Sequence, residues 1–179
     1  MEITTQLDGA VGGEPFVIQP SVIVNNKKGE HQSAFEGRVS VQLNQHDDEL
    51  FVPVWREGWP TPTENNINTL ISQNVIDGRV HFNGLGIDTA GDYQLKFILY
   101  DEHDLVMTTT IGDNFTVSVG EAHQLGIITH PESALGGTEF GIQPIVSVQD
   151  RGGNTVEDVN DGVVSVSLVN GPDDSTLCS

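Results

Sequence analysis

The sequence predicts an all-β protein made of two β-sandwiches in tandem, the second of them incomplete. Three observations support this fold class. Apolar and polar residues alternate with a period of two along several short runs, and Gly, Pro, Asn and Asp separate these runs. No long segment shows the 3.6-residue period of an amphipathic helix. A stretch near the beginning of the chain recurs near its end, at a spacing that fits a whole domain.

The alternation defines the expected strands of the first domain. Strands are predicted at residues 38–43, 79–82, 92–100 and 114–119. Turn residues bound these runs at Asp77-Gly78, Asn83-Gly84, Ala90-Gly91-Asp92 and Gly112-Asp113-Asn114. Short strands at this spacing favour a sandwich over a parallel α/β sheet. The side chains expected to point inward are Val39, Val41, Val80, Phe82, Leu95, Phe97, Phe115 and Val117.

The repeat sets the domain boundaries. Residues 12–26 read GGEPFVIQPSVIVNN, and residues 136–150 read GGTEFGIQPIVSVQD, at an offset of 124 residues. After one inserted residue, 37–43 corresponds to 162–168. We therefore expect one sandwich over residues 1–119 and the beginning of another over 120–179, joined by a short stiff linker at Gly120-Glu121-Ala122. The two copies, 12–43 and 136–168, should share their strand order.

The second domain is expected to be incomplete. The first copy continues from Leu43 to Val119, whereas only 11 residues follow Leu168. The second copy thus lacks about half of its strands, and those it keeps would expose apolar faces and open edges. We expect residues 125–168 to form an open half-sandwich. Either the chain is a stretch of a longer polypeptide, or a neighbouring chain donates the missing strands.

Three segments carry a resemblance to a known type of repeat: ITTQLDGAVGGEPFVIQPSVIV, DGRVHFNGLGIDTAGDYQLKF and GDNFTVSVGEAHQLGIITHPESALGGTEFGIQPIVSVQDRGGNTV. They resemble the tandem immunoglobulin-like repeats of very large surface proteins, found in bacterial adhesins and in related extracellular proteins of protists and algae. The resemblance implies an architectural role, as a stalk, filament or adhesin spacer that assembles or adheres outside the cell or at its surface. It carries over no catalytic residue. The first copy has NNKKGE where the second has QDRGGN, so a calcium or turn role there is not uniform.

One residue of this pattern has a defined structural role in such sandwiches. Tyr93 follows a tight connection at the start of an expected strand. This position resembles the tyrosine corner, in which the phenol bonds back to the nearby backbone. A structural role for Tyr93 is favoured over a catalytic one.

Composition excludes several classes of function. Seven Lys and Arg against 26 Asp and Glu leave a net charge of −19, which opposes binding to nucleic acids and to anionic membranes. The favoured interpretation of this charge is a solvated acidic surface. No apolar run approaches the ~20 residues that cross a bilayer, and the N-terminus lacks the pattern of a signal peptide. Cys178 is the single cysteine, so an internal disulfide is impossible, but it could pair outside the segment.

Motifs of enzymes are missing, and we expect no catalytic activity and no obligatory cofactor. The acidic clusters could supply ligands to Ca²⁺, with Asp101 and Asp104 as candidates, but solvated loops are the favoured interpretation of these clusters. Asn114 begins the triplet Asn-Phe-Thr, an N-glycosylation acceptor if the chain is secreted by a eukaryote.

The segment FVPVWREGWPTPTENNINTLISQNV carries both tryptophans, Trp55 and Trp59. Paired tryptophans on a loop can stack on sugars or anchor a protein partner. They can equally pack over the edge of the sandwich as a small satellite core, which is the favoured interpretation. The expected partners are therefore other copies or domains of the same filament or surface protein, and a glycan- or protein-binding module is the alternative function.

Overall fold

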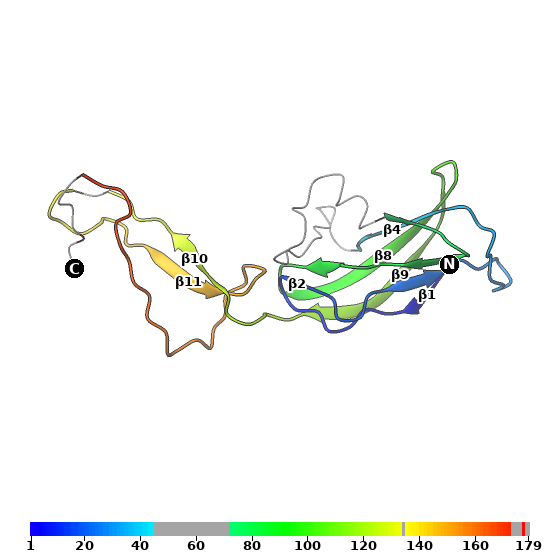
Figure 1. Ribbon diagram of the computed structural model, residues 1–179, viewed down its shortest axis with the longest axis horizontal. Helices are drawn as coiled ribbons and strands as arrows, with labels where there is room; N and C mark the ends of the chain where they lie inside the picture. The colour runs from blue at the N-terminus through cyan, green and yellow to red at the C-terminus, as the bar shows by residue number, and fades with distance from the viewer. Residues whose placement is uncertain (45–71, 134, 173–176, 178–179) are drawn as a thin grey trace.

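The computed structural model describes residues 1–44, 72–133, 135–172 and 177. These residues form an all-β structure of antiparallel sheets and contain no helix, so none that could cross a membrane (Figure 1). We call residues 1–119 the first unit and residues 120–179 the second unit. The described strands of the first unit are β1 (Glu2–Thr5), β2 (Glu14–Pro15), β3 (Ser21–Ile23), β4 (Gly37–Leu43), β5 (Ser72–Asn74), β6 (Arg79–His81), β7 (Gly86–Ile87), β8 (Gly91–Asp101) and β9 (Val106–Val117). Those of the second unit are β10 (Gln124–Thr129) and β11 (Ile145–Gln149).

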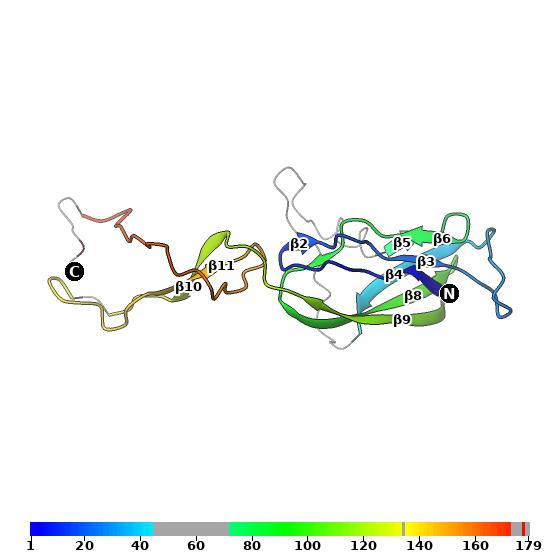
Figure 2. The same cartoon turned by 90° about the horizontal axis from the view of Figure 1, so that it is seen from below.

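The first unit has two sheets that pack face to face. One has the order β1-β3-β6 and the other β5-β4-β8-β9, and Figure 2 shows β3 and β6 in one layer with β8 and β9 in the other. The short pair β2-β7 lies at one end. One buried apolar cluster takes side chains from both sheets, including Val22 and Val80 from the first and Val39 and Phe97 from the second. This arrangement is consistent with the predicted β-sandwich.

The burial of the side chains that were expected to point inward confirms the predicted alternation. All of them except Phe115 are buried, with exposed fractions of 3% or less. Phe115 is half-buried and packs against the core, with its ring 5.6 Å from that of Phe16 in an edge-on arrangement. The apolar faces of β4 and β8 therefore lie where the sequence pattern places them.

Two of the predicted turns have different outcomes. Asp77 and Gly78 have φ angles of 49° and 67°, and the N–H groups of Ile76 and Arg79 each donate to the other's carbonyl at 2.9 Å, which confirms a tight turn. The turn predicted at 112–114 is wrong, because these residues lie inside β9. The register changes there from Lys96↔Ile111 to Gln94↔Asn114, so the polar residues form a β-bulge instead of a turn.

The second unit repeats the beginning of the first in backbone detail. Ile3 lies opposite Val22 in the β1–β3 pair, and Ile127 lies opposite Val146 in the β10–β11 pair. Each pair has a register shift just after that point. The left-handed glycines Gly13 and Gly137 have φ angles of 74° and 77°. The shared sequence block therefore specifies a shared local structure.

The correspondence ends at the last predicted strand, so the expectation of a strand-for-strand match holds only in part. Residues 162–168 are not a strand, although their counterpart is β4. Val39 and Val41 are 0% and 2% exposed, whereas the matching Val164 and Val166 are 44% and 66% exposed. β4 is held between β5 and β8, and the described part of the second unit has no such neighbours. Among the described residues of 125–168, β10 and β11 form one two-stranded sheet, so the expected half-sandwich is present only in these two strands.

Candidate functional site at the joint between the two units

The turn that follows β11 meets the end of the first unit. We call Asp150–Asn154, with the sequence DRGGN, the joint turn; Figure 1 shows it in orange beside the first unit. The N–H of Asp150 donates to the carbonyl of Asn154 at 2.9 Å, and Gly153 adopts a φ of 86°, which favours glycine. The N–H of Asn154 donates to Asp150 Oδ1 at 2.8 Å. The side chain of the first residue and the glycine therefore shape this turn locally.

The carboxylate of Asp150 is fully buried at the joint. Its Oδ2 accepts a hydrogen bond from the N–H of Gly120 at 2.8 Å and another from Asn154 Nδ2 at 2.9 Å. Burial raises the pKa of this carboxyl group, but the N–H donors of Gly120 and Asn154 outweigh burial and hold the pKa below its ordinary value. Asp150 is thus a buried anion that ties the linker to the joint turn.

Asn154 connects the joint turn to the first unit. Its Nδ2 donates to the carbonyl of Asp88 at 2.6 Å, and its Oδ1 accepts from the N–H of Ala90 at 2.8 Å. The side-chain amide therefore pairs with the backbone of the loop between β7 and β8 as a neighbouring strand would. A carboxylate could accept from Ala90 but could not donate to Asp88, so the site requires an amide.

Glycines allow the two backbones to approach closely. A Cβ on Gly12 would lie 2.7 Å from the carbonyl oxygen of Asp88 and 2.8 Å from Asp150 Oδ2. A Cβ on Gly152 would overlap the same Asp88 oxygen. At Gly136, the counterpart of Gly12 in the repeat, a Cβ would meet no heavy atom within 4 Å. A residue without a Cβ is therefore needed at position 12 for contact with the second unit. Gly136 makes no such contact among the described residues.

A second carboxyl group lies close to the joint. Burial, and after it the charge of Asp150, raises the pKa of Asp88 above its ordinary value. The two carboxylates repel each other, while N–H donors already occupy the oxygens of Asp150. No group of three or more His, Cys, Asp or Glu side chains gathers in the part of the chain that the structure describes. Hydrogen bonds from N–H groups hold this joint.

The first unit contains the counterpart of the joint turn at Asn26–Glu30, with the sequence NKKGE. The N–H groups of Lys28 and Glu30 donate to Asn26 Oδ1 at 2.9 and 3.0 Å, and Gly29 has a φ of 81°. The fold of the turn is therefore the same. Its residues 27–30 are exposed, and Lys28 occupies the position at which the joint turn has Gly152.

Asp101 and Asp104, the candidate calcium ligands, both lie at the turn between β8 and β9. Asp101 Oδ1 accepts hydrogen bonds from the N–H groups of Leu105 and His103, each at 2.9 Å, and the bond from Leu105 is the main cause that lowers the pKa of Asp101. Asp104 Oδ1 pairs with Arg38 Nε at 2.9 Å. Both carboxylates thus stabilise the turn, and calcium binding there stays a prediction.

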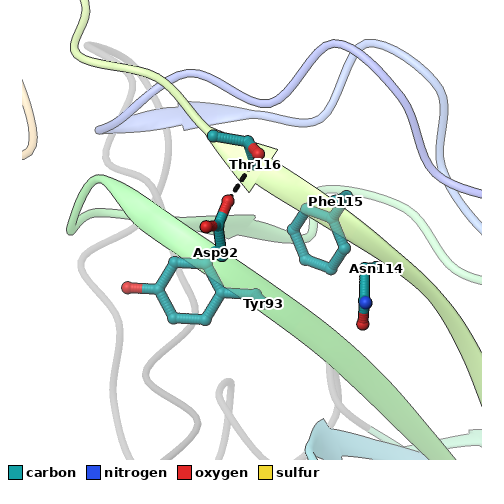
Figure 3. A pocket seen from close by; sticks show the side chains of 5 residues that line it. All are labelled: Asp92, Tyr93, Asn114, Phe115 and Thr116. Atoms are coloured by element: carbon teal, nitrogen blue, oxygen red, sulfur yellow. Dashed lines mark hydrogen bonds between the residues drawn. The ribbon is translucent and has the colours of Figure 1, made fainter.

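The tyrosine-corner prediction is confirmed. Tyr93 donates its phenol proton to the carbonyl of Thr89 at 3.0 Å, and burial raises the pKa of the phenol. Tyr93 lines a shallow depression of about 330 Å³ between β8 and β9. Figure 3 shows its side chain beside those of the other lining residues. Across this depression Thr116 donates to Asp92 Oδ1 at 2.6 Å. The depression therefore lies over a paired section of the sheet.

The remaining candidates from the sequence are separate from the joint. Asn114 is exposed on β9 and also lines the depression of Figure 3, and its glycosylation stays a prediction. Trp55, Trp59 and Cys178 lie outside the described residues. The joint residues themselves were not predicted as a site. The signal was present as the difference between NKKGE and DRGGN, but the sequence did not show which loop the second turn would meet.

Comparisons of the chain with protein-family models, with curated proteins and with solved structures found no match. The functional argument therefore depends on the geometry of the joint and on the internal repeat.

Proposed function

We propose that residues 1–179 act as an architectural segment of a large extracellular repeat protein, such as a stalk, a filament or an adhesin spacer. In this proposal the two units are tandem immunoglobulin-like sandwiches, with the domain boundary at residues 119 and 120. Their role is to hold neighbouring units at a fixed angle, so that many units together make an extended assembly or adhere to a cell surface. Partners are further units of the same type.

One observation carries the proposal: the side chain of Asn154 pairs with the backbone of Asp88 and Ala90 across the joint, at 2.6 and 2.8 Å. Two units on a flexible linker need no such contact, and a side chain ordered in this way costs conformational entropy. The linker itself is held at both ends, since Gly120 donates to Asp150 and the N–H of His123 donates to the carbonyl of Gln149 at 2.8 Å. These contacts favour a fixed angle over free rotation.

The charge of the chain fits the same role. A net charge of −19 opposes close lateral packing of such segments and keeps them soluble. Along the axis the two units meet at the joint, where the N–H groups of Gly120 and Asn154 donate to the buried Asp150 carboxylate.

The test exchanges the joint turn for its counterpart in the same chain. Asp150→Asn, Gly152→Lys and Asn154→Glu together convert DRGGN into NRKGE, which differs from the first-unit turn NKKGE only at Arg151. The turn still has the residues that fold it in the first unit, but the Cβ at position 152 meets the Asp88 oxygen. ¹⁵N relaxation should give one common tumbling time for both units in the natural chain and two separate times in the variant. Independent tumbling in the natural chain would contradict the proposal.

The alternative function is binding of a glycan or a protein by the Trp55 and Trp59 segment. Since these are the only two tryptophans in the chain, its intrinsic fluorescence reports on this segment alone. Quenching or a blue shift on addition of a glycan panel, lost in Trp55→Ala and Trp59→Ala, would favour this alternative.

A further inference from the structure

The strand β9 is a long edge of the first unit that carries apolar side chains into solvent. It lies at the end of the order β5-β4-β8-β9 and has 12 residues (Figure 2). Val106 and Met107 on this strand are 59% and 56% exposed, and Leu105 just before it is 63% exposed. Residues 105–112 contain no charged side chain. This edge therefore combines unpaired backbone groups with exposed apolar side chains, which favours pairing with another chain.

The other edges of the two large sheets differ from β9. β1, β5 and β6 are the remaining edge strands, and each has four residues or fewer. β6 also carries Arg79 and His81. Short length and charged side chains are the usual means by which an edge strand is kept from pairing with other chains. β9 has neither over residues 105–112, and its one irregularity in that part is the register shift opposite Leu99 and Tyr100.

The first unit itself covers part of the edge of β9. Thr110 Oγ1 donates to the carbonyl of Met1 at 3.2 Å, and the N–H of Asp113 donates to Gln6 Oε1 at 3.4 Å. The beginning of the chain therefore lies beside residues 110–113. We call residues 105–109 the free edge, since all five of them are exposed.

The free edge begins next to an acidic turn. Asp101, Glu102 and Asp104 all lie where β8 turns into β9. Arg38 Nε pairs with Asp104 at 2.9 Å, and His103 lies 3.9 Å from Glu102. Three carboxylates thus face one permanent cation in this part of the described chain. A partner on the free edge is attracted if it is basic at this end and repelled if it is acidic there.

We propose that the free edge binds an extended segment of a different protein, made of uncharged β-branched residues and followed by a basic residue. The segment adds antiparallel to β9, so its C-terminal end brings the basic residue to Glu102. The added strand pairs with the backbone of the free edge, and its apolar side chains lie beside Val106 and Met107. This goes beyond the proposed function, because it assigns a surface and a partner outside the repeat.

A second copy of this chain fits the free edge less well. If two free edges paired antiparallel, the acidic turn of each copy would lie beside residues 110–113 of the other. These residues include Asp113 and already contact Met1 and Gln6. Each copy also carries a net charge of −19, and like charges on neighbouring strands are destabilising. A basic segment of another protein meets neither obstacle.

The repeat directs the approach to β1 away from the free edge. In the second unit, the N–H of His123 donates to the carbonyl of Gln149, whose counterpart in the first unit is Asn25. Since β10 is the counterpart of β1, a residue before Met1 would lie beside the end of β3 in the same way. β3 belongs to the sheet that does not contain β9. The occupant of the free edge is therefore a separate molecule.

The test uses the full chain and a fluorescein-labelled synthetic peptide of alternating threonine and valine that ends in two lysines. Anisotropy should show saturable binding. Val106→Lys should weaken it by about tenfold or more, because a lysine on an edge opposes strand pairing and repels the basic end of the peptide. Val17→Lys is the matched control, since it makes the same change at a side chain after β2 that is 81% exposed. It should bind as the natural chain does, and equal binding by the two variants would overturn the proposal.

A second peptide, identical except that it ends in two glutamates, tests the charge of the acidic turn. It should bind roughly tenfold more weakly than the lysine peptide at low salt, and Glu102→Gln should reduce this difference. Equal binding of the two peptides by the natural chain would refute the assignment of a basic partner.

Hydrogen exchange with the lysine peptide reads out the location. Amides of residues 106–110 should gain protection, and those of β11 should not change. Protection confined to residues 145–149 would place the peptide on the second unit and contradict the proposal. Self-association of the chain that Val106→Lys abolishes and the lysine peptide does not displace would assign the free edge to a second copy and refute the proposal as well.

Discussion

Replacement of Asp150 by alanine tests whether the joint is held by its buried carboxylate. The substitution removes the acceptor of the Gly120 and Asn154 N–H groups, which lie 2.8 Å from Oδ2 and Oδ1. The contacts to Asp88 and Ala90 are made by the side chain of Asn154, so they remain in the variant. That side chain loses its hydrogen bond to the Asp150 carboxylate, which orients it. The first unit does not depend on Asp150 for its own core.

The expected loss follows from the hydrogen bonds. Each bond from an N–H group to a charged acceptor contributes ~1.5–3 kcal/mol net, and release from the cost of burying a carboxylate offsets part of the loss. The bond to Gly120 is the one that ties the linker to the turn, so docking should weaken by about 2–3 kcal/mol. The ratio of docked to undocked molecules then falls on the order of 30- to 150-fold.

The assay is a distance distribution between two spin labels, one on each unit. Lys27→Cys and Ile128→Cys place the labels at exposed positions in a Cys178→Ser background. The natural joint should give a narrow distribution and Asp150→Ala a broad one. Asp158→Ala removes the same charge at an exposed position outside the joint turn and should leave the distribution narrow. A narrow distribution in Asp150→Ala, with an unchanged mean, would refute the assignment of the joint to this carboxylate.

Three further predictions concern the same chain. Gly12→Ala should broaden the distance distribution as Asp150→Ala does, because its Cβ meets the joint, while Gly136→Ala at the repeat counterpart should not. The width should also depend on pH. Protonation of Asp88, whose pKa is raised in the docked state, should tighten the joint as pH falls through that raised pKa toward 3.8. Protonation of Asp150, whose pKa is lowered, should open the joint as pH falls below 3.8 toward that lowered pKa. Asp88→Asn should abolish the first effect and leave the second. Finally, Gln19→Ala should lower the free energy of unfolding of the first unit by about 2 kcal/mol in urea titrations, whereas Gln143→Ala, which loses one exposed bond, should change it by less than about 0.5 kcal/mol.

The core of the first unit could be predicted from the sequence because its signal is local. A period of two in β4 and β8 puts alternate side chains on one face, and the Asp77-Gly78 pair specifies a tight turn without help from distant residues. The residues at 112–114 have the same turn chemistry, yet they lie in β9, because pairing with β8 on both sides of them outweighs the local preference. The bulge there depends on the partner strand, which one segment of sequence does not describe.

The joint could not be predicted for a related reason. Its contacts connect Gly12, Asp88 and Asn154, which are far apart in the sequence and meet only because one end of the sandwich faces the next unit. The repeat did show which residues are common to both copies. It did not show that a difference between the copies, Lys28 against Gly152, lies at a contact.

That difference shows that the residues that fold the turn are not the same as those that dock it on the first unit. In both copies an Asn or Asp side chain accepts N–H groups from within the turn, and a left-handed glycine completes it, so the NKKGE and DRGGN turns form alike. Docking needs two more features, an amide at position 154 that can both donate and accept and a residue without Cβ at position 152. The first copy has neither, since it has Glu30 and Lys28 at these positions. Changes at positions 152 and 154 are therefore expected to remove the joint while the turn keeps its fold, and the Asn26–Glu30 turn cannot dock on another unit by the contacts that the joint turn makes.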